Sequence, residues 1–318
     1  MITPEIITIT VLDILFFVFG TIGFFIALKI ILYYDAAATT QRQYTLEKQS
    51  YLSATIIKFL LFFKTITFFF FVYTLNKLSL FLPGAMCAAG VVNAVKSGTA
   101  LLLLKILNLY IFAFWIVLHN EDMEYEKQPY LKLKFILYSV AYLLLVSEIV
   151  MELDYFFAID PSSVVDCCGA IFSTTDGSYM AALLSLDFSY QLGAFYLLYG
   201  AIVLFYLLQN RYLFAVVNLL FVIVALITLI SLFGTYIYEL PTHHCPFCLL
   251  QADYHYIGYF LYLFLFLGTF NGISVGLLEF TKEKEQQKFR YSLLFTTLYT
   301  LCVSYFPLAY YLRNGMWL

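Results

Sequence analysis

The clearest chemistry in this sequence lies in His243-His244-Cys245-Pro246-Phe247-Cys248, a short polar segment between two long apolar runs. Two cysteines in the C-x-x-C spacing can form a disulfide, exchange with another disulfide, or hold a soft metal ion between two thiolates. The adjacent imidazoles add metal ligands or a local proton acceptor. Two further short segments carry cysteine, Met86-Cys87 and Cys167-Cys168. The function therefore depends on whether the three segments meet in space.

The first hypothesis is thiol–disulfide exchange, which would make the chain a thiol-disulfide oxidoreductase. Pro246 stiffens the turn between the two cysteines, and His244 favours the thiolate of its neighbour. The Cys-Pro-Phe-Cys motif resembles the C-x-x-C of membrane thiol oxidoreductases of the vitamin K epoxide reductase kind, a likeness that covers these four residues. A quinone is one candidate cofactor, and an extracytoplasmic thioredoxin-like protein is the candidate partner. The candidate catalytic residues are Cys245, Cys248, Cys167, Cys168 and Cys87.

The second hypothesis is binding or delivery of a soft metal, with a metallochaperone as the candidate partner. Thiolate and thioether ligands select Cu(I), whereas zinc accepts cysteine and histidine in a tetrahedral site. The candidate ligands are His243, His244, Cys245, Cys248 and Met86. A third hypothesis needs no chemistry beyond folding, because extracytoplasmic oxidation could lock the loops of a non-catalytic membrane-complex subunit with disulfides.

The composition places this chemistry in a membrane. Hydrophobic residues make up 63% of the 318 residues and charged residues 12%, against about 25% charged in soluble domains. The mean hydropathy is +0.88. The sequence contains no Walker motif, no G-x-G-x-x-G and no H-E-x-x-H, so we expect no nucleotide and no nucleic acid among its ligands.

Long apolar runs predict an all-α integral membrane protein in which eight helices form a single transmembrane domain over residues 1–318. Runs of about 20 apolar residues span a bilayer as helices. Phe, Leu, Ile and Tyr dominate these runs without alternation, which argues against a barrel. The runs lie near residues 7–34, 53–82, 98–119, 133–157, 179–208, 212–238, 256–279 and 291–312.

The connecting segments predict the orientation. Ten Lys and Arg residues lie in the connections after the first, third, fifth and seventh runs, and only two, Lys96 and Arg313, lie in the alternate set. Positive loops stay in the cytoplasm, so both termini and all three cysteine-bearing loops are predicted on the extracytoplasmic side of the plasma (inner) membrane. Each of these loops has Gly at or near the start of the helix that follows, which suggests repeated helix-loop-helix hairpins.

Ionisable residues within the apolar runs form a second candidate site. A charge in lipid costs roughly 2.5–3.5 kcal/mol on insertion scales, so it usually faces a partner or a cavity. We expect Lys77 and Lys105 to pair with acidic residues and Lys64 to extend toward the membrane surface. The predicted proton or charge layer consists of Asp13, Lys77, Lys105, Glu148 and Asp187, with Glu152 at a similar depth.

Overall fold

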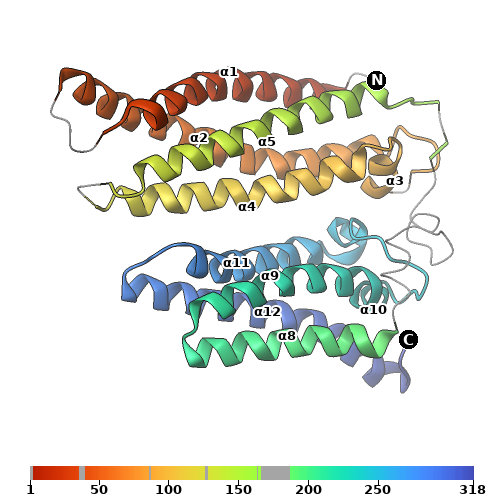
Figure 1. Ribbon diagram of the computed structural model, residues 1–318. Helices are drawn as coiled ribbons and strands as arrows, with labels where there is room; N and C mark the ends of the chain where they lie inside the picture. Colours follow the sequence, from red (N-terminus) through yellow and green to blue (C-terminus); the bar gives the residue numbers. More distant parts are fainter. Residues whose placement is uncertain (1–2, 36–39, 86, 126–127, 163, 166–186) are drawn as a thin grey trace. The chain divides into compact units, whose positions relative to one another are not determined.

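The computed structural model is helical, as the apolar runs predict (Figure 1). It describes residues 3–35, 40–85, 87–125, 128–162, 164–165 and 187–318. Over these ranges, eight helices are long and apolar enough to cross a membrane. The chain is therefore a multi-pass helical membrane protein. The orientation of its termini, the hairpin repeat and the single domain over residues 1–318 stay predictions.

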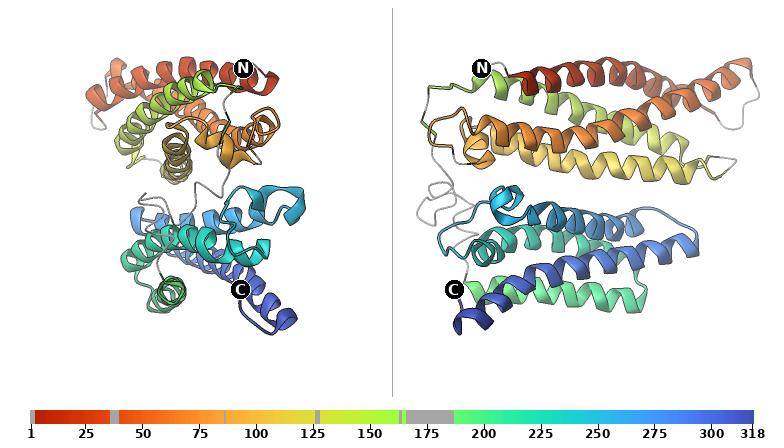
Figure 2. Two further views of the ribbon diagram at one scale, coloured as in Figure 1. Left: turned by 90° about the vertical axis from the view of Figure 1, so that its right-hand side faces the viewer. Right: turned by 180° about the vertical axis from the view of Figure 1, so that it is seen from behind.

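The chain divides into two compact units, and the first consists of Met1–Pro83 and Val91–Val165. Its long helices are α1 (Pro4–Tyr33), α2 (Gln41–Leu78), α4 (Gly98–Asp122) and α5 (Leu131–Ala158). Each packs against two of the others, in the ring α1, α2, α4, α5 (Figure 2). Trp115 and Tyr138 are fully buried in the core, and the Trp115 indole donates to the Lys134 carbonyl oxygen over 2.7 Å. The short helix α3 (Ala88–Asn93) crosses the boundary between the units.

The second unit consists of Gly84–Gly90 and Asp166–Leu318. Its long helices are α8 (Phe188–Leu208), α9 (Arg211–Thr228), α11 (Ile257–Leu277) and α12 (Lys282–Asn314), which pack in a ring in that order. The π-helix η1 (Leu229–Phe233) and α10 (Gly234–Tyr238) extend α9 into a single span. The connection from α10 to α11 contains two 3-10 turns, η2 (Cys248–Leu250) and η3 (Ala252–Tyr254).

Two helices are much longer than the apolar runs that predict them. The run at 53–82 belongs to α2, which begins at Gln41 and has 38 residues, a length of about 57 Å at the α-helical rise. The run at 291–312 belongs to α12, which begins at Lys282. Residues 41–52 and 282–290 were expected to be connections. They are helical because Gln, Lys, Glu and Arg are good helix formers, whereas hydropathy detects only the part that lies in lipid.

A row of glycines brings α11 close to its neighbours in the second unit. Gly268, Gly272 and Gly276 repeat every four residues and therefore share one face of the helix. A Cβ atom at Gly268 would lie 2.8 Å from the backbone nitrogen of Thr296 on α12, and one at Gly276 would lie 2.4 Å from the Cβ of Ala215 on α9. Small residues at such positions let helix backbones approach closely in membranes.

We predict that Gly268→Ala destabilises the second unit, because the new methyl group meets backbone atoms that cannot rotate away. Overpacking of this kind costs about 1–3 kcal/mol, so the melting temperature in detergent should fall. Gly200→Ala is the matched control, since a Cβ there meets nothing within 4 Å. An equal melting temperature for Gly268→Ala and wild type would contradict this packing.

Candidate metal centre

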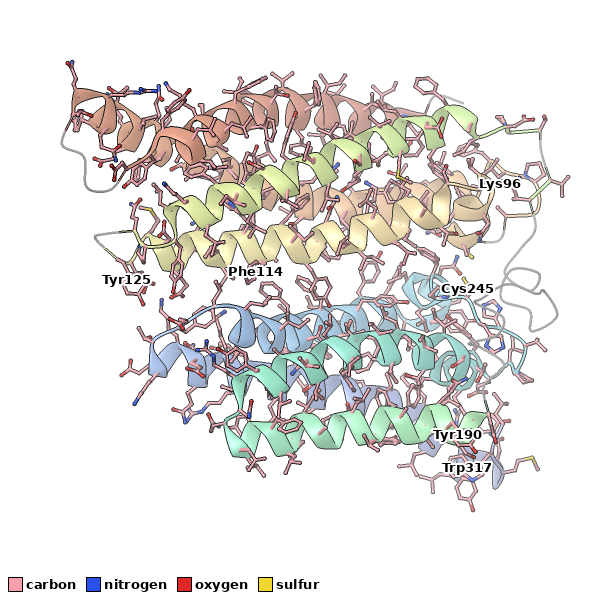
Figure 3. All side chains as sticks on the ribbon, in the orientation of Figure 1. Lys96, Phe114, Tyr125, Tyr190, Cys245 and Trp317 are labelled. Atoms are coloured by element: carbon pink, nitrogen blue, oxygen red, sulfur yellow. The ribbon has the colours of Figure 1, made fainter. Side chains whose placement is uncertain are left out.

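Three cysteine side chains converge in the second unit. Cys87 comes from the Gly84–Gly90 segment, and Cys245 and Cys248 come from the connection between α10 and α11. Their sulfur atoms lie within 4.8 Å of one another, and those of Cys87 and Cys245 are 3.3 Å apart. All three side chains are buried, with exposed fractions of 1%, 1% and 6% for Cys87, Cys245 and Cys248. Figure 3 shows Cys245 in this connection.

Tyrosine hydroxyl groups hold the Cys-Pro-Phe-Cys turn to the helices around it. Tyr238, the last residue of α10, donates its hydroxyl hydrogen to the Cys245 carbonyl oxygen. Tyr262 on α11 donates to the Pro246 carbonyl oxygen over 2.7 Å. Both carbonyl groups sit where the turn has no regular secondary structure, so these bonds satisfy backbone acceptors that the fold would otherwise leave unpaired.

A π-turn at the end of the preceding span places His244. The Gly234 N–H donates to the Leu229 carbonyl oxygen, five residues earlier, instead of four. A Cβ at Gly234 would lie 2.8 Å from that same oxygen, which explains the glycine. The His244 Nδ1 atom lies 3.1 Å from the Ile230 carbonyl oxygen. A carbonyl only accepts, so Nδ1 carries the hydrogen and the turn fixes the tautomer of His244.

His243 lies beside the cysteines with a nitrogen that makes no hydrogen bond. Its ring packs edge-on against Tyr238, with ring centroids 4.4 Å apart. Burial lowers the pKa of His243, the charge of Cys87 opposes that shift, and His244 adds to it. The Nε2 atom is buried and has no hydrogen-bond partner. Within the described residues, neither His243 nor His244 belongs to the group of donor atoms that lie within 4.8 Å of one another.

The cysteine geometry suits metal ligation. The 3.3 Å between Cys87 and Cys245 is well beyond the length of a disulfide bond, about 2.05 Å. Zinc–sulfur bonds of about 2.3 Å in a tetrahedral site place the sulfurs about 3.8 Å apart. A small rearrangement of three side chains would therefore suffice to place a soft ion among them. Of the other candidates from the sequence, Met86, Cys167 and Cys168 lie outside the described residues.

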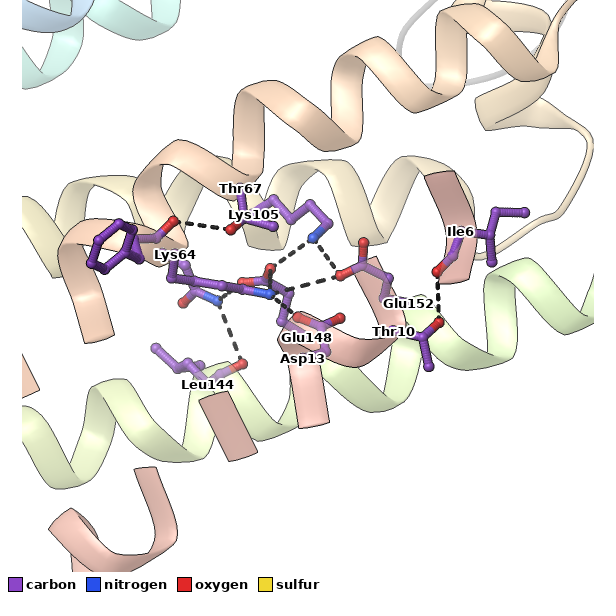
Figure 4. A network of polar contacts seen from close by, with 11 residues as sticks. Ile6, Thr10, Asp13, Lys64, Thr67, Lys105, Leu144, Glu148 and Glu152 are labelled. Carbon is purple, nitrogen blue, oxygen red and sulfur yellow. Dashed lines mark hydrogen bonds and ion pairs between the residues drawn. The ribbon is translucent and has the colours of Figure 1, made fainter. Parts of the chain in front are cut away.

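Five charged side chains of the apolar runs gather in the first unit (Figure 4): Asp13, Lys64, Lys105, Glu148 and Glu152. Lys105 contacts Glu148 over 2.8 Å and Glu152 over 2.6 Å. Lys64 contacts Asp13 over 2.5 Å, so the expectation that it extends to the membrane surface is wrong. It follows the start of the apolar run at residue 53 by 11 residues, about 16 Å at the helical rise, which is too far for a lysine side chain to reach the surface.

Two residues of the predicted charge layer are not in this cluster. Lys77 is exposed near the end of α2, where its ammonium group lies over the ring of Tyr73. Asp187 is exposed and caps α8, where its carboxylate accepts a hydrogen bond from the Ser189 backbone N–H. Both lie near helix ends, where a charged side chain reaches water or the backbone and needs no buried partner.

The fold and the site define a multi-pass helical membrane protein with a buried cluster of cysteine thiols. No protein-family model, no curated protein and no solved structure matches the chain.

We predict that Tyr262→Phe exposes Cys245 in metal-free protein. Loss of one hydrogen bond worth about 1 kcal/mol should raise the open population of the turn, and with it the alkylation rate of Cys245, about fivefold. The rate is measured by mass spectrometry after timed reaction with a small maleimide. Tyr259→Phe removes an exposed hydroxyl on the same helix and should leave the rate unchanged. Equal rates for the two variants would show that the hydroxyl of Tyr262 does not hold the turn.

Proposed function

We propose that this protein binds a soft metal ion, Cu(I) or Zn(II), through Cys87, Cys245 and Cys248. The observation that carries the proposal is the convergence of three buried sulfur atoms within 4.8 Å. A metal ion gains from every added sulfur ligand, and three sulfurs converge here. The choice of sulfur over carboxylate ligands selects soft or borderline metals.

Burial favours a metal over exchange with a partner protein. Exchanging cysteines attack disulfides in other molecules, and they sit in partly exposed positions that those molecules reach. The exposed fractions of Cys87 and Cys245 are each 1%, which leaves little of either sulfur open to a second protein. A metal ion is small enough to enter with a brief opening of the turn, and it then holds the turn closed.

The unpaired Nε2 of His243 supplies a candidate fourth ligand. Zinc prefers four ligands, and three thiolates with one neutral imidazole form a common structural set. Burial lowers the pKa of His243, which favours the neutral ring that metals bind. Movement of this ring toward the sulfurs would complete a Cys₃His site. Cu(I), by contrast, is satisfied by the sulfurs alone, so the dependence on His243 distinguishes the two ions.

Thiol–disulfide exchange is the second candidate function. The observation that favours it is the 3.3 Å distance between the sulfur atoms of Cys87 and Cys245. Each of these thiols lies within reach of the other, so oxidation would join them with little movement of the backbone. In that case the two thiols would lose two electrons and two protons to an outside acceptor such as a quinone as the Cys87–Cys245 bond forms. Attack by Cys248 on Cys245 would then break this bond, release the Cys87 thiol and leave a Cys245–Cys248 disulfide.

We place the site on the extracytoplasmic side of the plasma membrane. The asymmetry of Lys and Arg between alternate connections supports this orientation. A metal site there would receive its ion from an extracytoplasmic metallochaperone. The orientation and the chemistry are separate proposals, and they are tested separately.

The metal proposal predicts that protein purified without oxygen or chelator carries about one Cu or Zn per chain. Metal content and free thiols are measured on the same sample, by elemental mass spectrometry and by thiol titration. Cys245→Ser should remove most of the metal, whereas Cys302→Ser should retain it, because Cys302 lies on α12 outside the group of three. His243→Ala should weaken Zn binding and leave Cu(I) binding unchanged.

Protein without metal would contradict the metal proposal. If its Cys87–Cys245 bond also forms and breaks with the redox state of the cell, exchange takes its place. If Cys245→Ser and Cys302→Ser lower the metal content equally, the ion is bound at another site.

The orientation predicts which loops a membrane-impermeant maleimide reaches in intact cells. Ser162→Cys, in an exposed position after α5, should be labelled from outside. Lys282→Cys, at the start of α12, should be labelled only after the membrane is permeabilised. The reverse pattern would place the cysteine site in the cytoplasm and would leave the metal proposal intact.

A further inference from the structure

A cluster of buried charges joins all four long helices of the first unit. Asp13 comes from α1, Lys64 from α2, Lys105 from α4, and Glu148 and Glu152 from α5. Every one of these residues is at most 3% exposed. Lys64 reaches three carboxylates, at 2.5 Å from Asp13, 3.2 Å from Glu148 and 3.8 Å from Glu152.

The charges of this cluster do not balance. Among the described residues that contact one another here, three carboxyl groups face two ammonium groups, so full ionisation leaves one negative charge. The amide of Asn108 on α4 also contacts Glu148, and it carries no charge. An uncompensated charge inside a membrane protein is strongly unfavourable, so buried charges are paired or neutralised. The cluster therefore needs one more positive charge.

The hydrogen bonds show which carboxyl groups have an oxygen atom free to bind the additional positive charge. Both oxygens of Glu148 are in use: Oε1 contacts the two lysines, and Oε2 accepts from the Asn108 amide over 2.5 Å. Asp13 uses only Oδ1, which contacts Lys64, and Glu152 uses only Oε2, which contacts both lysines. Their second oxygens, Oδ2 and Oε1, are buried and have no hydrogen-bond partner. Glu148 is thus held as a carboxylate, while Asp13 and Glu152 each keep an oxygen that can take a proton.

The small space beside the two lysines excludes most other cations. A cavity of about 10 Å³ is lined by residues that include Lys64, Lys105 and Glu148. That volume accepts about one water molecule. A hydrated metal ion would not fit, and a bare one would have two ammonium groups for neighbours.

We propose that this cluster is a proton-binding site that holds one exchangeable proton on Asp13 or Glu152. Binding converts one carboxylate to a carboxyl group and takes the cluster from a charge of −1 to zero. No other bond forms or breaks. The site lies in the first unit and is independent of the metal proposed for the cysteines of the second.

Infrared spectroscopy of the reconstituted full-length protein at neutral pH tests the proposal. Wild type should show the carbonyl stretch of a protonated carboxyl group, and the band should shift in D₂O because the proton exchanges. Glu152→Gln and Asp13→Asn each leave two carboxylates against two lysines. Each single substitution should therefore abolish the band, whichever residue carries the proton. Asp154→Asn, an exposed neighbour on the same helix, should keep it.

Three results would overturn the proposal. The first is a wild-type spectrum without the band, which needs no variant and so does not depend on the folding of one. The second is a band that both substitutions leave in place. The third is a band that shows no shift after prolonged incubation in D₂O, since the proton would then be a fixed structural one. If wild-type protein lacks the band and its melting temperature rises with the sodium concentration, a bound sodium ion supplies the missing positive charge instead.

Discussion

The hydrocarbon interior of the bilayer supplies no hydrogen bonds and no counter-ions, and the rest of this structure follows from that constraint. Backbone groups must be paired within the chain, so the described spans are helices. Charges must be paired as well, and Lys64 and Lys105 pair with carboxylates in a cluster to which four different helices contribute. The same pressure leaves apolar side chains on the outside of each unit, since lipid tails accept them without cost.

The two units meet this constraint with different cores. The first buries ion pairs between its helices, where each bond to a lysine also fixes the relative position of two helices. The second relies on close approach, with the glycine row of α11 against α9 and α12. Tyr238 and Tyr262 hold its Cys-Pro-Phe-Cys turn. A proton site and a soft-metal site fit these two environments, because the first is rich in carboxylates and the second in sulfur.

The apolar runs indicate where the spans lie but not where the helices begin and end. Hydropathy measures transfer to lipid, so it predicts the apolar portion of α2 and α12 but not the charged turns at the start of each helix, from Gln41 and from Lys282. The glycine spacing at 268, 272 and 276 was readable as a close-packing face. Lys64 could also have been placed correctly, since its distance from the ends of the apolar run already exceeded the reach of its side chain.

The sequence by itself determined that this is a multi-pass helical membrane protein, and it predicts that most of its cysteines lie in short connections. Composition and run length suffice for that, because transfer to lipid depends on each segment alone. Only the tertiary structure decided that Cys87 meets Cys245 and Cys248, across a separation of 158 residues for the first pair. It also decided that Lys64 rather than Lys77 completes the charge cluster. Such contacts depend on how helices pack and turn about their axes, and no local property of the sequence specifies that.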